Sequence, residues 1–550
     1  MNKSSRSFAE RKMWKYKLLL KEAKKRESPA VILSSRIKLV RELRRIGKIK
    51  EAQEQLEKAR NLYEKIKEPS FLMSIYFEKA QLRDMTGDTK KAIKFYTKAL
   101  KIAENVNDKK SMSNILNGLG LVYQKGGNWK KALEHHEKAL EISKEISDNG
   151  EGIASTYNNL GLVYAEKGEW DRATEYYEKS LEISSKSGDF YNAAIPLENL
   201  GLIYYRKGKW DKAIKCHKKS LEISERFGDA HRMVAIYNNL GLVYAEKGEW
   251  DRAINNYENA LRISKRLDDV YGIAQTFVNL GSVYANKGKW DIAINNYENA
   301  SKTFRKLGDI HGIASANNNL GSIFLDKGDW DTANRYFGKA LKTFEKLGNP
   351  YGIVTACLGL GSVYSNMKNW DKATEYYERS LKISEELGDV YEIAQSFLGL
   401  GSVCSNKGEL DKATKYNEKS LEIFRNLGDI HGVARTYVNL GIDYANREDW
   451  DKATECYKNA LKTFEKLGDP YGKAKTLGNF GILYKKIGQL EKSENFLFES
   501  LEIFSKLDAK HDTKTTLNKI HDLIEKYKEK GENEKAEKIL KKIELIEKIK

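Results

Sequence analysis

The sequence predicts an all-α fold, an α-solenoid of about 12 to 13 helix pairs stacked in one row. Three observations predict it. A unit of 40 residues recurs along most of the chain, each copy carries two apolar stripes of helical spacing, and only five Pro occur while charged residues make up 32%, which is typical of water-soluble helix. Because a stacked array can lengthen without a larger core, the length of 550 residues indicates many repeats rather than several separate domains.

The unit is clearest in residues 150–189, where two amphipathic helices are expected. The first helix carries its apolar and small residues at Ala154, Tyr157, Leu160, Gly161 and Tyr164. The second carries them at Trp170, Ala173, Tyr177, Ser180, Leu181 and Ser184. Gly168 predicts the end of the first helix. Gly188 predicts the end of the second, and Asp189 is suited to cap the N-terminus of the next first helix.

The glycine inside the first helix aligns the copies. Ten regular copies carry it, at Gly120, Gly161, Gly201, Gly241, Gly281, Gly321, Gly361, Gly401, Gly441 and Gly481. We therefore divide the chain into a basic N-terminal helical extension (1–28), two divergent repeats (29–108), ten regular repeats (109–510) and a polar C-terminal capping helix pair (511–550). Pro196 lies inside a first helix and should remove one backbone hydrogen bond and kink or delay that helix.

Trp-Asp dipeptides also recur every 40 residues, as in Trp170-Asp171 and Trp210-Asp211, and such dipeptides occur in β-propellers. A propeller blade needs four short strands of alternating polarity, whereas each stretch between these dipeptides has helical periodicity. The propeller is therefore excluded.

The net charge of +18 is concentrated at the front of the chain. Residues 1–50 hold seventeen Lys or Arg against four Asp or Glu, and residues 511–550 hold eleven against nine, which leaves a net +3 for the rest. The basic segment from Lys3 to Arg26 also contains Phe8, Trp14 and Tyr16. It could bind nucleic-acid phosphates or acidic lipid headgroups, but its leucines favour a helix that caps the first repeat.

The other residue types that could carry catalysis or bind metal form no recognisable motif. Cys216, Cys357, Cys404 and Cys456 have no paired spacing and are expected to be reduced thiols in or near the core. No His or Cys cluster has metal-ligand spacing, and no phosphate loop or nucleophile motif stands apart from the repeat. We predict no cofactor, no metal and no enzymatic activity.

The chain shows no apolar leader or transmembrane segment, so a cytoplasmic location is expected.

The pattern Leu160, Gly161, Tyr164, Gly168, Ala173 and Tyr177 resembles the tetratricopeptide repeat (TPR), and the resemblance covers residues 29–548. The 40-residue form, with Gly-Asp between copies and Asn-Leu-Gly in the first helix, is similar to the repeats of Pins-type spindle adaptors and kinesin light chains. The resemblance implies a right-handed superhelix whose first helices line a concave groove for a protein or peptide ligand. The usual Pro between 34-residue repeats and a GoLoco-like motif are absent.

Two residues before the central glycine, most copies carry an asparagine. This ladder consists of Asn159, Asn199, Asn239, Asn279, Asn319, Asn439 and Asn479, with Gly359 and Gly399 interrupting it. An amide side chain both donates and accepts, so the ladder is suited to hold the backbone of an extended peptide in the groove. The alternative is that each asparagine bonds a neighbouring helix or a water molecule.

Six residues before the glycine, only Arg435 and Lys475 are cationic. The resemblance implies that an Arg here acts with the Asn of the same helix on acidic peptides, and each pair, Arg435 with Asn439 and Lys475 with Asn479, lies one helical turn apart. The alternative is two solvated charges at the groove edge. Five residues after the glycine, the copies carry side chains of either charge and then neutral amides: Glu166, Arg206, Glu246, Asn286, Asp326, Asn366, Asn406 and Asn446.

The sequence thus predicts a non-enzymatic adaptor or scaffold that binds a partner protein or peptide segment in the concave groove of the superhelix. One alternative is a regulator that acts on nucleic acid or a transcription complex through the basic N-terminal segment. Another is a regulator of the same shape that senses a small peptide.

Overall fold

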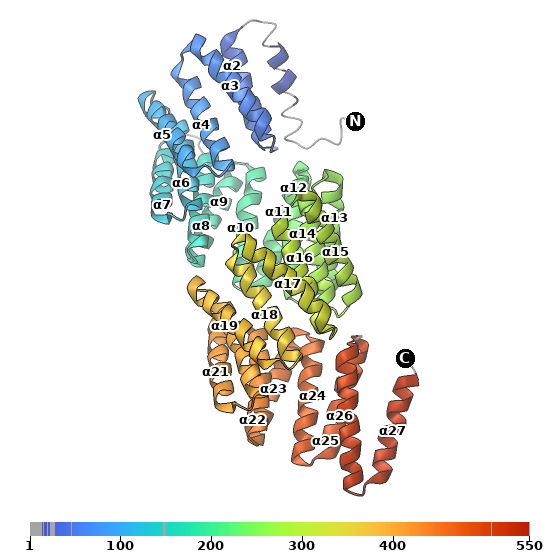
Figure 1. Ribbon diagram of the computed structural model, residues 1–550. Helices are drawn as coiled ribbons and strands as arrows, with labels where there is room; N and C mark the ends of the chain where they lie inside the picture. The colour runs from blue at the N-terminus through green and yellow to red at the C-terminus, as the bar shows by residue number, and fades with distance from the viewer. Residues whose placement is uncertain are drawn as a thin grey trace. The chain divides into compact units, whose positions relative to one another are not determined.

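The computed structural model describes residues 14, 16–18, 20–22, 28–45, 47–146, 150–507 and 509–548, and these residues contain helices and connecting turns but no β-strand (Figure 1). The first helices of successive pairs are α2 Pro29–Arg45, α4 Pro69–Met85, α6 Lys109–Lys125, α8 Gly150–Glu166, α10 Phe190–Arg206, α12 Ala230–Glu246, α14 Val270–Asn286, α16 Ile310–Asp326, α18 Pro350–Asn366, α20 Val390–Asn406, α22 Ile430–Asn446, α24 Pro470–Ile487 and α26 Lys510–Glu529. The second helices are α3 Ile49–Ile66, α5 Thr89–Asn105, α7 Trp129–Lys144, α9 Trp170–Lys186, α11 Trp210–Phe227, α13 Trp250–Leu267, α15 Trp290–Leu307, α17 Trp330–Leu347, α19 Trp370–Leu387, α21 Leu410–Leu427, α23 Trp450–Leu467, α25 Leu490–Lys506 and α27 Asn533–Lys548. The predicted all-α solenoid of helix pairs is confirmed.

The expected turn chemistry is also confirmed. Gly168 between α8 and α9 has a φ of +77°, a conformation that glycine adopts without strain. The Asp189 side chain accepts a hydrogen bond from the backbone N–H of Asn192 over 3.2 Å and so caps α10. The predicted delay at Pro196 is wrong, because α10 begins at Phe190 and continues through the proline. A ring at this position removes one N–H but leaves the preceding turns of the helix in place.

Within each pair, small residues allow the two helices to approach closely. A Cβ atom added at Gly161 would lie 2.7 Å from the ring of Tyr177, which is itself almost fully buried. In the repeat that contains Gly361, the ring of Tyr377 packs on the glycine in the same way. These contacts explain why the central glycine and the second-helix aromatic recur together, since a larger residue at the glycine would displace the ring.

The Trp-Asp dipeptides act at the junctions between pairs. The Asp binds a cation at the C-terminal end of the following first helix, with N–O distances of 2.6 to 2.8 Å in Lys207–Asp171, Lys287–Asp251, Lys327–Asp291 and Lys407–Asp371. Asp411, which follows Leu410 in place of Trp, binds Arg447 in the same way over 2.9 Å. The dipeptide therefore belongs to a helical junction and not to a propeller blade.

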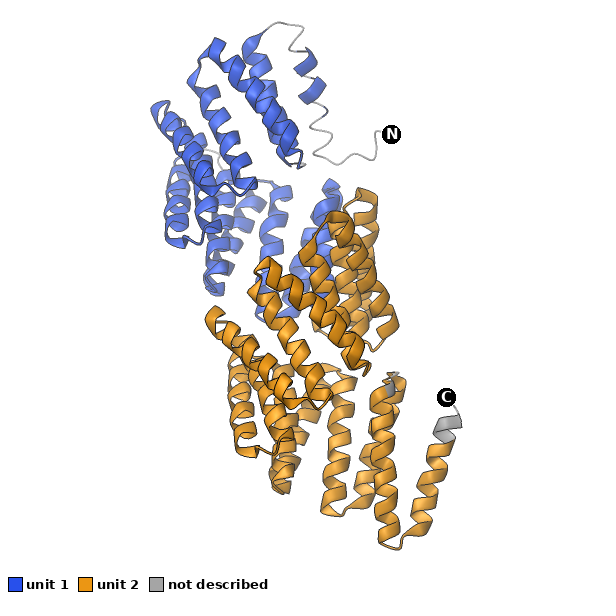
Figure 2. Ribbon diagram, in the orientation of Figure 1, with its two compact units in different colours: residues 1–243 blue, residues 244–550 orange. Residues whose placement is uncertain are grey.

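The chain forms two compact units, residues 1–243 and 244–550 (Figure 2). In the first unit, Leu20 is buried in one cluster with Leu33 and Val40 of α2. The rest of the predicted basic segment, residues 1–13, 15, 19 and 23–27, lies outside the described residues. In α2 itself, Arg41 and Arg44 bind the buried carboxylate of Glu78 over 3.0 and 3.3 Å, so these cations serve the packing of α2 on α4.

In the second unit, repeats that are far apart in the chain also touch. The ring of Trp330 at the start of α17 lies 5.1 Å from the ring of His511 in α26, at an interplanar angle of 70°. Trp290 of α15 is buried in one cluster with Phe504 and Ala509. The connection between α25 and α26 therefore packs on repeats four and five positions upstream.

The four cysteines are free thiols, as predicted. Cys357 and Cys456 are buried, whereas Cys216 and Cys404 are half-buried. Desolvation by burial raises the pKa of the Cys357 thiol to about 11, so this group stays protonated at neutral pH. These side chains fill the core as small apolar groups.

Candidate functional site

The predicted asparagine ladder lies on the first helices, where each residue is close to the preceding repeat. All seven side chains are half-buried: Asn159, Asn199, Asn239, Asn279, Asn319, Asn439 and Asn479. A polar group in this position either bonds the neighbouring helix or remains available to solvent and ligands.

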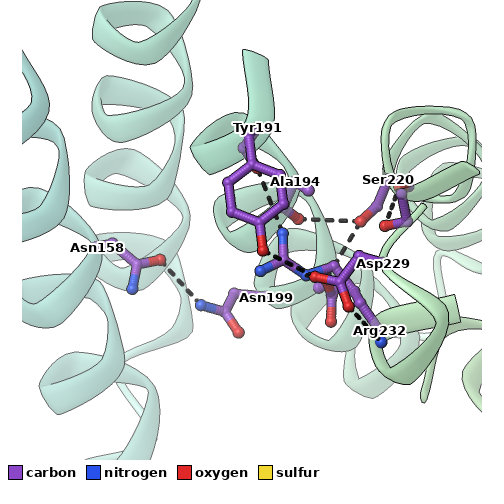
Figure 3. A network of polar contacts seen from close by, with 9 residues as sticks. Asn158, Tyr191, Ala194, Asn199, Ser220, Asp229 and Arg232 are labelled. Carbon is purple, nitrogen blue, oxygen red and sulfur yellow. Dashed lines mark hydrogen bonds and ion pairs between the residues drawn. The ribbon is translucent and has the colours of Figure 1, made fainter. Parts of the chain in front are cut away.

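Two members of the ladder bond the preceding first helix. Asn199 Nδ2 donates to Oδ1 of Asn158 over 2.9 Å (Figure 3), and Asn439 Nδ2 donates to the backbone oxygen of Leu398 over 3.4 Å. Asn279 also has a partner. Asn199 and Asn439 therefore brace neighbouring repeats, as the alternative interpretation of the ladder expects.

Four other members, Asn159, Asn239, Asn319 and Asn479, form no hydrogen bond to any residue in the described part of the chain. None of their amide atoms is enclosed without a partner in that part either, so these amides reach solvent. An accessible amide that the fold does not use can donate to and accept from a peptide backbone.

At the two interruptions of the ladder, an aromatic ring packs closely on the glycine. A Cβ atom at Gly359 would lie 2.3 Å from the ring of Phe337, and one at Gly399 would lie 2.3 Å from the ring of Tyr377. In both places an aromatic ring of the preceding second helix lies directly against the glycine. An aromatic residue also stands at this position before Asn199 and Asn479, so the ring alone does not explain the change from Asn to Gly.

The predicted cations Arg435 and Lys475 are both exposed. Arg435 Nη1 donates to Oε1 of Gln395 on the preceding first helix over 3.1 Å. Lys475 Nζ lies 4.4 Å from the centre of the Tyr471 ring one turn earlier on α24. Both charges are held by weak contacts that an incoming carboxylate can replace.

The structure also brings both cations near Asp326 at the end of α16. Asp326 is an exposed residue as a whole, but the surrounding protein removes hydration from its carboxyl. This desolvation raises its pKa to about 6, while the charges of Lys475 and Arg435 act in the opposite direction. Asp326 of first helix α16 therefore lies within electrostatic reach of cations on first helices α22 and α24.

Two further acidic groups share this region. Asp512 and Asp469 also act on the Asp326 carboxyl and raise its pKa. Tyr471 donates its hydroxyl to Oδ2 of Asp512 over 3.0 Å, and Lys519 of α26 has a pKa lowered by desolvation. The candidate site thus combines cations and carboxylates from α16, α22, α24 and α26. The sequence placed Asp326 on the first-helix face but could not pair it with cations from three and four repeats downstream.

A second polar cluster, in the first unit, was missed by the sequence analysis (Figure 3). Arg232 Nε lies 3.4 Å from Oε1 of Glu198, and its guanidinium lies 5.0 Å from the centre of the Tyr191 ring. Tyr191 donates its hydroxyl to Oδ2 of Asp229 over 2.9 Å. One signal was available, because Glu198 and Arg232 are departures of opposite charge from the repeat pattern in adjacent copies.

Comparison with known proteins identifies the family. Residues 37–105, 111–186, 192–266, 272–346, 353–426 and 432–506 match the family model described as tetratricopeptide repeat. The chain belongs to the tetratricopeptide repeat family. The resemblance predicted from the sequence is thereby confirmed. No curated protein matches this TPR protein.

Several solved structures are similar to parts of the TPR protein. BtubC (BKLC) from P. vanneervenii is 26% identical, with 40% of this chain and 92% of that chain covered and a TM-score of 0.38. A Rap protein complexed with Competence and Sporulation Factor is 15% identical, with 64% and 98% covered and a TM-score of 0.47. A signal transduction ATPase with numerous domains and a TPR sensor, from Pyrococcus horikoshii, is 16% identical, with 61% and 53% covered and a TM-score of 0.47.

In the described residues, no helix has the length and apolar character that a membrane crossing requires. Nor do His, Cys, Asp and Glu side chains gather there in threes or more in a way that suits a metal ion.

Proposed function

We propose that this TPR protein is a non-enzymatic scaffold that holds an extended, acidic peptide segment of a partner protein along its first helices. In the second unit, Asn319 and Asn479 bind the peptide backbone, and Arg435 with Lys475 binds an acidic side chain of the peptide. Asn159 and Asn239 offer the equivalent amides in the first unit. The observation that carries the proposal is the convergence of Arg435, Lys475 and Asp326 from three first helices in one region.

The accessible amides support the same proposal. An extended peptide must find partners for its N–H and C=O groups when it leaves water, and amides without internal partners can supply them. The carboxylates beside Arg435 and Lys475 add selectivity, because an acidic ligand gains from the two cations only where it keeps away from Asp326.

The test uses the full-length chain and a library of random short peptides. Peptides selected on the wild type should be enriched in Asp and Glu. The pair Arg435→Ala/Lys475→Ala should weaken a selected peptide by about 1 to 3 kcal/mol in isothermal titration calorimetry. The pair Asn319→Ala/Asn479→Ala should weaken peptides regardless of their side chains.

Lys342→Ala/Lys462→Ala is the matched control, since these lysines are exposed on second helices α17 and α23 and the loss of charge is the same. Unchanged affinity in both first-helix pairs, or an equal loss in the control pair, contradicts the proposal.

A further inference from the structure

A pocket of about 480 Å³ lies between second helices α21 and α23, over first helix α22. Its floor consists of Leu421, Leu440 and Cys456, which are all buried. Tyr437 and Tyr444 of α22 form its aromatic wall. The pocket is therefore apolar at its base and lies apart from the first-helix face described above.

The repeat of residues 150–189 shows what fills the same place elsewhere. There the ring of Tyr176 stacks on Tyr164 with 5.3 Å between ring centres and an interplanar angle of 2°, and lies 6.0 Å from Tyr157. Tyr437 and Tyr444 are the counterparts of Tyr157 and Tyr164. The counterpart of Tyr176 is Cys456, whose side chain ends at Sγ, so the pocket is open where a ring would lie.

The same stack recurs in three further repeats. The ring centres lie 5.5 to 5.6 Å apart and the planes within 7° in Phe324–Tyr336, Tyr364–Tyr376 and Tyr484–Phe496. In each case the second ring comes 12 residues after the first, as Cys456 follows Tyr444. The fold thus fills this position repeatedly with Tyr or Phe, and the open pocket has the size and the stacking surface for that ring.

The rim of the pocket is acidic in effect. Of its two cations, Lys452 Nζ is paired with Oδ2 of Asp449 over 3.0 Å, and Arg425, whose Nη2 donates to the neutral Tyr437 hydroxyl over 2.6 Å, keeps its charge. Its carboxylates, Glu418, Glu422 and Glu455, form no ion pair with any described residue. Three carboxylates therefore outnumber the one unpaired cation. A ligand that inserts a ring here therefore meets unpaired negative charge at the entrance.

We propose that this pocket binds a tyrosine or phenylalanine side chain of a partner protein, flanked by Lys or Arg, with its ring stacked on Tyr444. The inserted ring takes the place that Tyr176 occupies on Tyr164, and the flanking cations pair with the rim carboxylates. A second contact on the second helices adds to any segment held on the first helices and raises the affinity for a partner that carries both.

The test uses the full-length protein and capped tripeptides, with affinities measured by NMR titration of the peptide. Wild type should bind Lys-Tyr-Lys about tenfold more tightly than Lys-Ala-Lys, because only the former buries a ring. Cys456→Tyr fills the pocket with the chain's own ring and should abolish that preference. Cys216→Tyr is the matched control, since it is the same substitution at the equivalent position, where Leu197 replaces the wall tyrosine, and it should leave the preference unchanged.

Tyr444→Leu provides a second variant that removes the stacking surface without filling the pocket, and it should lower the preference as well. The proposal is overturned if wild type shows no preference for the tyrosine peptide, if it binds Lys-Leu-Lys as tightly, or if Cys456→Tyr and Cys216→Tyr behave alike. Circular dichroism of each variant shows that the comparison is made between folded proteins.

Discussion

Asn417 donates a hydrogen bond of 2.7 Å from Nδ2 to Oδ2 of Asp443, and both side chains are fully buried between α21 and α22. The other oxygen of each group, Oδ1 of Asn417 and Oδ1 of Asp443, is buried without a partner. In the adjacent repeats Tyr377 and Tyr457 stand in the place of Asn417, and Val403 and Leu483 in the place of Asp443. This junction therefore replaces an apolar contact of the array with a polar pair that is only partly satisfied.

Restoring the apolar pair should stabilise this junction. Burial raises the pKa of Asp443, so its ionised form is disfavoured in the fold, and an unpaired buried acceptor has no water to compensate it. We expect Asn417→Tyr/Asp443→Val to raise the free energy of unfolding by about 1 to 4 kcal/mol. Asp443→Val alone should gain less, because it leaves the Asn417 amide unpaired. Urea denaturation combined with hydrogen exchange in α21 and α22 measures both effects, and equal values for the single and double variants would contradict the explanation.

His217 should make the protein less stable in acid. Burial lowers its pKa to about 4, whereas histidine in an unfolded chain titrates near 6.5. Between these values the unfolded chain binds a proton that the folded protein does not, so stability falls as pH drops from 6.5 to 4, by about 3 kcal/mol in total. His217→Tyr copies Tyr177 of the preceding repeat and should raise the thermal midpoint more at pH 5 than at pH 8. An equal shift at both values would attribute the effect to packing instead.

The fold was predictable because its signals are local and repeated. Asp189 caps a helix and Gly168 ends one through contacts within a few residues, and each repeat shows the same pattern again. The pairing of Lys207 with Asp171 was not predicted, although both residues recur, because periodicity alone does not tell which side chains of neighbouring repeats meet.

The candidate site was predictable only in part. The sequence placed Arg435, Lys475 and the asparagines on the first helices. It could not show which asparagines bond the preceding helix, because this depends on side-chain geometry, whereas the residue type is the same in each of these copies. The grouping of charges around Asp326 depends on the rotation between successive repeats. The pocket beside Cys456 depends on the space that remains when a small side chain stands where other repeats have an aromatic ring. These are properties of the packed structure and not of one repeat.

Asp326 should weaken the binding of acidic peptides at neutral pH. Its pKa is raised to about 6, mainly by desolvation, so it is ionised at pH 7.5 and repels a carboxylate that approaches Arg435 or Lys475. We expect Asp326→Asn to tighten an acidic peptide roughly fivefold at pH 7.5, which corresponds to about 1 kcal/mol of repulsion removed. Wild type should approach the variant's affinity as pH falls below 6. Asp331→Asn, with the same change of charge on second helix α17, is the control, and equal effects of the two substitutions would contradict a local role of Asp326.

Glu198 should destabilise the first unit at alkaline pH, the opposite sign to His217. Burial raises its pKa to about 7, while Arg232 and a hydrogen bond from Ser220 act against this shift. In the unfolded chain the carboxyl loses its proton near pH 4.3, so stability falls as pH rises from about 4.3 to 7 and the full penalty remains above pH 7. Glu198→Gln keeps the shape of the side chain and should therefore raise the thermal midpoint at pH 8 but not at pH 4.

Arg232→Ala provides the complementary measurement. At pH 8 it leaves an ionised Glu198 without its partner at 3.4 Å, whereas at pH 4 the Glu198 carboxyl is neutral and the losses are the contacts of Arg232 with Tyr191 and its ion pair with Asp229 at 3.7 Å. The loss of stability should therefore be larger at pH 8, and it should depend less on pH when Arg232→Ala is introduced into Glu198→Gln, where only the ion pair with Asp229 still responds to pH. A loss of equal size at both pH values in the single variant would mean that Arg232 acts through its stacking on Tyr191 and not through the charge of Glu198.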